Sequence, residues 1–154
     1  MPITSLGHVG IHVNDLERSK AFYTEMLGLH VNDESERIVF MSAQDRVKEH
    51  HELVLARGRV DGTVVQQISF RCGSLQDVRD YYKKFLEHDV TINRVVSHGN
   101  AIGLYFADPD GNNIEVYYPT NIDWPQPFGV PVDLINDTDE EILNAHLTKE
   151  YTPR

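Results

Sequence analysis

The chain has 154 residues, of which 40% are hydrophobic and 25% charged, an ordinary composition for one globular domain with a sizeable core. Its formal net charge of −10 argues against the basic face that nucleic acids and anionic membranes require. No apolar run is long enough to span a membrane, and the first ten residues lack the pattern of a signal peptide. We therefore expect a cytoplasmic protein that binds a small molecule.

Two related segments open the two halves of the chain. Residues 7–27 align with residues 66–86 at a constant offset of 59, strand on strand and helix on helix. In each segment an alternating strand pattern leads into a helix through a capping signal, Asn14-Asp15 in the first and Ser74 in the second. The strand patterns place Val9, Ile11 and Val13 opposite His8, Gly10 and His12, and Ile68, Phe70 and Cys72 opposite Gln67, Ser69 and Arg71.

Three further strands are predicted after each helix, at 29–32, 37–42 and 50–56 and at 90–97, 101–107 and 113–118. Residues 108–112, DPDGN, are typical of a tight turn between the last two. The pattern predicts a single α+β domain of two paired β-α-β-β-β modules, residues 1–60 and 61–118, whose sheets together form a cup.

A C-terminal extension, residues 119–154, follows the second module. Its first part is rich in proline and contains Trp124 and Phe128, which favours an extended segment lying over the domain. Thr138 is a good N-cap, and the acidic residues that follow it favour the first turn of a short helix. The extension would close the cup or bind a second subunit.

Polar residues occur at equivalent inward positions of the two modules. His8 corresponds to Gln67 on the first strands, and Glu52 corresponds to Glu115 on the last. Approximate two-fold symmetry would bring these four side chains together, and their nitrogen and oxygen donors suit a divalent metal. A shift of one residue would turn His51 inward in place of Glu52.

Apolar candidates for the lining of the cup are Phe40, Val54, Leu104 and Tyr117, which favour an aromatic or planar ligand. Polar residues that also face the cup, His12, Ser69 and Arg71, have no assigned chemical role. Cys72 reads as a buried strand residue, and His30, His88 and His146 are expected at the surface.

The paired modules, the opening HVGIHVNDLERSKAFYTEMLGL and the closing YFADPDGNNIEVYY resemble the vicinal oxygen chelate superfamily. That superfamily includes glyoxalase I, fosfomycin- and bleomycin-resistance proteins and extradiol ring-cleaving dioxygenases. The resemblance covers roughly the first 120 residues. Its members host several chemistries on one fold.

The resemblance to single-domain extradiol dioxygenases implies a role for each polar residue. His8 and Glu115 match the metal-binding histidine and glutamate, and His98 and Tyr105 match a histidine and a tyrosine that act beside the metal. Such an enzyme would bind Fe(II) and cleave a catechol-like aromatic substrate with O₂, as in aromatic compound catabolism. Gln67 stands where the extradiol pattern has a second histidine.

Two alternatives remain open. A glyoxalase-like lyase, isomerase or epimerase would hold Zn, Ni, Co or Mn with His8, Glu52, Gln67 and Glu115 and would need no O₂. A metal-free protein of the bleomycin-resistance kind would only sequester a small molecule. Many relatives build such cups in dimers, so the resemblance also implies a homodimer.

Overall fold

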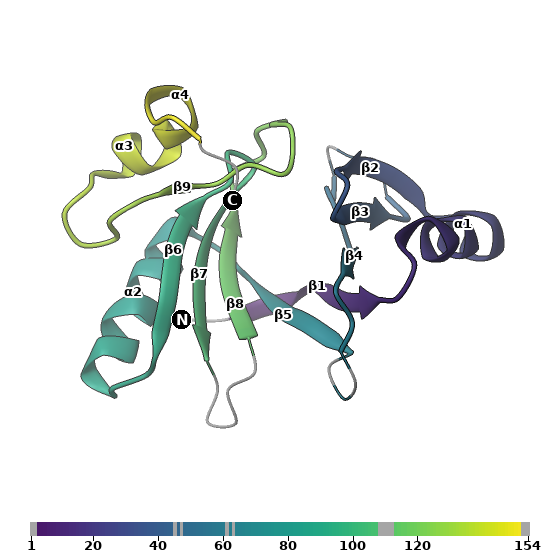
Figure 1. Cartoon of the computed structure of the whole chain (residues 1–154). Coiled ribbons are helices and arrows are strands. Elements are labelled where there is room, and N and C mark those ends of the chain that lie inside the picture. The colour runs from purple at the N-terminus through teal and green to yellow at the C-terminus, as the bar shows by residue number, and fades with distance from the viewer. Residues whose placement is uncertain are drawn as a thin grey trace. The chain divides into compact units, whose positions relative to one another are not determined.

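The computed structural model describes residues 3–44, 46, 48–60, 62, 64–107 and 113–151 (Figure 1). They form two compact units. The small unit is Gly7–Ile68, and the large unit combines Met1–Leu6 with Ser69–Arg154. Each unit mixes strands with helices, which confirms the predicted α+β class. The predicted DPDGN turn at 108–112 lies outside the described residues.

The small unit has the predicted β-α-β-β-β order. Its elements are β1 (Ile3–Val13, in this unit from Gly7), α1 (Leu16–Leu27), β2 (His30–Glu34), β3 (Ile38–Ser42) and β4 (Leu53–Arg57). The strand order is β2-β3-β4-β1, with β1 parallel to β4 and the other pairs antiparallel. Asp15 caps α1 by accepting the N–H of Arg18, and Gly28 ends it with a φ of 70°.

The core of the small unit lies between the sheet and α1. It consists of the buried side chains Val13, Leu16, Val39, Met41 and Leu55. Val13 is on the face predicted to be apolar, whereas His8 and His12 alternate to the other face. Phe40 pairs with Val54 across β3 and β4, and neither belongs to this core, as expected for residues on the opposite face.

The large unit repeats the same order. Its elements are β5 (Val65–Cys72, in this unit from Ser69), α2 (Leu75–Glu87), β6 (Ile92–Ser97), β7 (Ala101–Ala107) and β8 (Asn113–Pro119), with the short β9 (Val130–Pro131) added at the edge. The strand order is β5-β8-β7-β6-β9. Ser74 caps α2 by accepting the N–H of Asp77, and α2 packs on β7 and β8.

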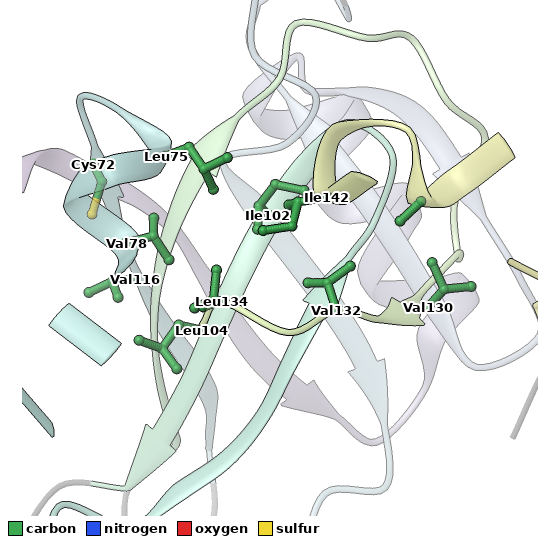
Figure 2. Close-up of a cluster of buried hydrophobic side chains, with 11 residues drawn as sticks. Cys72, Leu75, Val78, Ile102, Leu104, Val116, Val130, Val132, Leu134 and Ile142 are labelled. Atoms are coloured by element: carbon green, nitrogen blue, oxygen red, sulfur yellow. The ribbon is translucent and has the colours of Figure 1, made fainter. Parts of the chain in front are cut away.

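A continuous apolar cluster joins α2, the sheet and the extension in the large unit (Figure 2). Its buried members are Cys72, Leu75, Val78, Ile102, Leu104, Val116, Val130, Val132, Leu134, Ile142 and Ala145. Leu104 was predicted to line the ligand cup, and that prediction is wrong. Because Tyr105 faces the opposite side of β7, Leu104 points to the helix side and packs in the core.

The extension is fastened to α2 by Arg79. Its guanidinium donates to the backbone carbonyls of Leu134 and Asp137 and to the carboxylate of Asp139. Two short helices follow, α3 (Asp139–Leu143) and α4 (Ala145–Thr148). Thr138 forms a capping box with Glu141, which confirms the predicted helix start.

Of the three histidines predicted at the surface, two are exposed and one is buried. His30 and His88 are exposed, whereas His146 is buried with its ring 4.6 Å from that of Trp124. The prediction for His146 is therefore wrong, because the extension folds back and places this residue under its own tryptophan. Among the described residues, no helix is long and apolar enough to cross a membrane.

Candidate active site

His8 and Gln67 meet within the small unit, as the repeat predicts. Both side chains are more than nine-tenths buried, and Gln67 Nε2 lies 3.0 Å from His8 Nε2. An amide N–H that donates to Nε2 leaves the His8 proton on Nδ1. Equivalent residues of β1 and β5, 59 positions apart in the sequence, are therefore in direct contact in a buried place.

Glu52 and His51 occupy different surroundings. The Glu52 carboxylate is exposed and accepts hydrogen bonds from Ser42 Oγ at 3.0 Å and from the backbone N–H of Ala43 at 2.9 Å. The His51 ring lies 4.2 Å from that of His8, between their centroids. The Glu52 backbone is hydrogen-bonded to both neighbouring strands, its N–H to the Met41 carbonyl at 2.9 Å and its carbonyl to the Val9 N–H at 3.1 Å. In this arrangement the ring of His51 lies beside that of His8, while the Glu52 side chain turns to Ser42 and Ala43.

A hydrogen-bonded chain stands behind His51. His51 Nδ1 is 2.8 Å from His50 Nδ1, and His50 Nε2 is 2.8 Å from Asp33 Oδ2. Arg46 also pairs with this carboxylate at 3.0 Å. Since a carboxylate accepts, His50 Nε2 carries a proton, so that in a neutral His50 ring Nδ1 is the acceptor for His51. The sequence showed adjacent histidines but no sign of this chain.

Glu115 is the buried carboxylate of the large unit. It is 2% exposed, and its Oε2 accepts the Ser69 hydroxyl at 2.6 Å. Gly103 on β7 leaves room for Oε1, because a Cβ at that position would approach it closer than 3.0 Å, which Cβ atoms essentially never do. Burial raises the pKa of Glu115, while the hydrogen bond from Ser69 and, less strongly, the nearby Tyr105 hydroxyl and Arg94 guanidinium partly oppose that rise.

Tyr105 lies directly opposite Glu115 in the β7–β8 ladder, which confirms that the two share a face. Its hydroxyl is 2.8 Å from His98 Nε2, and its ring is covered by the guanidinium of Arg94, 4.1 Å from the centroid. Burial, followed by the nearby Glu115, holds the pKa of Tyr105 well above its ordinary value. Tyr105 therefore keeps its proton at neutral pH. On the same face Arg71 lies over the Tyr117 ring, 5.9 Å away.

The donor chemistry of both groups fits a divalent metal. His8 offers an imidazole nitrogen, and Gln67 can offer its amide oxygen once the amide no longer donates to His8. A cation would also offset the burial of the Glu115 charge. Among the described residues, no three His, Cys, Asp or Glu side chains form a metal-binding cluster.

Comparison with known proteins identifies the family of the chain. The model of the glyoxalase/bleomycin resistance protein/dioxygenase superfamily matches residues 5–116. The chain belongs to this superfamily. It is 29% identical to biphenyl-2,3-diol 1,2-dioxygenase 3 of Rhodococcus globerulus, over 72% of this chain and 61% of that protein. It is 30% identical to 1,2-dihydroxynaphthalene dioxygenase of Pseudomonas sp. (strain C18), over 82% of this chain and 42% of that protein.

The solved structures similar to this chain include a dioxygenase and a glyoxalase. Homoprotocatechuate 2,3-dioxygenase from Brevibacterium fuscum, solved as an anaerobic substrate complex, matches with a TM-score of 0.65 and 27% identity over 78% of this chain and 38% of that chain. The Mn(II)-bound glyoxalase from Novosphingobium aromaticivorans matches with a TM-score of 0.66 and 25% identity over 87% and 43%. The chain thus spans about four to six tenths of the length of these superfamily members.

Proposed function

We propose that the protein is a metal-dependent extradiol-type dioxygenase that cleaves a catechol-like aromatic substrate. The observation that carries this proposal is the hydrogen-bonded pair of His98 and Tyr105 beside the buried Glu115. The glyoxalase pattern does not require a histidine and a tyrosine at these positions. The superfamily relatives named above include dioxygenases of aromatic diols, which supports the same substrate class.

His8, Gln67 and Glu115 would hold the metal, with Fe(II) as the ion best suited to O₂ chemistry. The repeat equivalence of His8 and Gln67 and the burial of all three donors support this set. When bound, an open Fe(II) site supplies positions for both oxygens of a catechol and for O₂. Glu52 is retained as a candidate fourth ligand, which would require its carboxylate to leave Ser42 and Ala43.

The remaining residues would bind and orient the substrate and move its proton. Tyr105, protonated at neutral pH, can donate a hydrogen bond to a substrate oxygen. His98 Nε2 is placed to accept a proton through that hydroxyl or to return it. His51, whose ring lies 4.2 Å from that of His8, can exchange a proton with a group held at His8. Homodimer formation and a cytoplasmic location remain predictions from the sequence.

A glyoxalase-like lyase, isomerase or epimerase is the second candidate. Gln67 favours it, because a neutral amide replaces the second imidazole of the dioxygenase pattern. The Mn(II)-bound glyoxalase is a structural neighbour. Such an enzyme would use Zn, Ni, Co or Mn and would turn over a hemithioacetal or a related substrate without O₂.

Substitution of His98 tests the proposal against a matched control. His98→Phe removes the acceptor for Tyr105, whereas His88→Phe changes an exposed histidine at the end of α2. We expect His98→Phe to lower catechol-dependent O₂ uptake about a hundredfold, the usual range for loss of a proton-transfer group, with unchanged metal content. His88→Phe should behave as wild type. Equal activity of the two variants would refute the role of His98.

A further inference from the structure

His98 is held by the C-terminal extension as well as by its own hairpin. Its Nδ1 is 2.5 Å from the backbone carbonyl oxygen of Phe128. A carbonyl can only accept, so Nδ1 carries a hydrogen, and in the neutral ring Nε2 keeps its lone pair. That nitrogen is the one 2.8 Å from the Tyr105 hydroxyl, which therefore donates to it.

Strand pairing brings the Phe128 carbonyl to this place. In the ladder between β9 and β6, Val130 lies opposite Ser97, the residue before His98. Gln126 adds a second tie, since its Nε2 donates to the His98 carbonyl at 2.7 Å and its Oε1 accepts the Phe128 N–H at 3.0 Å. One side chain thus joins the backbones of both partners.

Aromatic packing fixes the same segment. The Trp124 ring lies edge-on to Phe128, 5.6 Å between centroids, and Phe128 in turn packs on Tyr151 at 5.1 Å. Trp124 also fills the space above Gly99, where a Cβ would come closer than 3.0 Å to its side chain. The segment 124–128 is consequently seated on the turn that carries His98.

We propose that residues 124–128 are a positioning segment that sets the tautomer of His98. With Nδ1–H committed to Phe128, the basic nitrogen is always the one that faces Tyr105. In the opposite tautomer a bare Nδ1 would face the carbonyl oxygen, lone pair against lone pair. The catalytic consequence rests on the function proposed above, whereas the tautomer assignment itself depends only on the large unit.

Long-range ¹H–¹⁵N correlation spectra of the metal-free protein, labelled with ¹⁵N-histidine and recorded at pH 8, test the assignment. We expect His98 to show one tautomer, protonated at Nδ1. Gln126→Met removes both polar ties at similar volume, and Gln76→Met makes the same change at an exposed site on α2. His98 should become a mixture of tautomers in Gln126→Met and stay unchanged in Gln76→Met.

Turnover supplies a second measurement. In Gln126→Met we expect kcat for a catechol to fall about tenfold, the effect of one lost hydrogen bond, with KM and metal content unchanged. A wild-type His98 protonated at Nε2, or one tautomer kept in Gln126→Met, would overturn the proposal. The wild-type spectrum decides the assignment even if that variant fails to fold. Because it needs neither metal nor substrate, it also stands if dioxygenase activity proves absent.

Discussion

Gly103 gives the sharpest test of how Glu115 is seated. It lies in the middle of β7, and its φ is not in the left-handed region, so alanine is permitted by the backbone. An added Cβ would nevertheless approach both Glu115 Oε1 and the Tyr105 ring closer than 3.0 Å. The carboxylate must therefore move, and it is already held by Ser69 at 2.6 Å.

The size of the effect follows from two opposing contributions. Overpacking of a well-packed site costs about 1–3 kcal/mol, while removal of a glycine from the unfolded chain contributes about 0.4–1 kcal/mol of stability. We expect Gly103→Ala to lower the free energy of unfolding by about 1–2 kcal/mol. Gly73→Ala is the control, because a Cβ there meets its nearest atoms at ordinary distances of 3.5 and 3.6 Å.

Urea unfolding of the metal-free variants at 25 °C measures this difference, and titration with Fe(II) or Mn(II) measures the ligand geometry. Gly73→Ala should be as stable as wild type or slightly more stable, with unchanged metal affinity. Gly103→Ala should bind metal at least about tenfold more weakly, because displacing the Glu115 carboxylate need weaken the binding free energy by only about 1.4 kcal/mol for that change. If both variants matched in stability and metal affinity, the seat described for Glu115 would be refuted.

Three further predictions concern the large unit. Burial, and less strongly Asp77, raises the pKa of the Cys72 thiol to about 11 from 9.0, so stability should fall as pH rises above 9, by about 1 kcal/mol at pH 10. The difference in urea midpoint between wild type and Cys72→Ala should then shrink between pH 8 and pH 10, and a constant difference would contradict it. Arg79→Met should cost about 2–3 kcal/mol in unfolding experiments by releasing the extension, an effect that Lys83→Met should not show. Thr138→Ala should cost about 1 kcal/mol by the same measurement, and no loss would exclude a stabilising role for the capping box.

The repeat carried most of the fold prediction. An offset of 59 between two strand-helix segments predicted both β-α-β-β-β units, their helix caps and the polar faces of β1 and β5. The same offset predicted the contact of His8 with Gln67. Alternation along β7 and β8 predicted that Tyr105 and Glu115 share a face, which the register confirms.

The errors have local physical reasons. Leu104 was assigned to the ligand face although it is adjacent to Tyr105, and neighbours in a strand cannot both point inward. For His51 and Glu52 the sequence left both possibilities open, because a one-residue shift exchanges their faces; the His51 ring lies beside His8. His146 is buried because of a tertiary contact with Trp124.

Contacts made by the backbone left no signal in the sequence. The Phe128 carbonyl that binds His98 would be the same for any residue at position 128, and only the pairing of β9 with β6 brings it there. The chain from Asp33 through His50 to His51 depends in the same way on how the loop before β4 folds. Such contacts follow from topology, which the residue pattern describes only in outline.

The most direct test of the central claim is the metal content of protein purified without oxygen, measured by plasma mass spectrometry together with O₂ uptake on a panel of catechols. We predict stoichiometric iron and O₂ uptake that depends on the catechol, with a yellow ring-opened product. Zinc, nickel or manganese without O₂ uptake in any reconstituted sample would contradict the dioxygenase assignment and favour a glyoxalase-like enzyme.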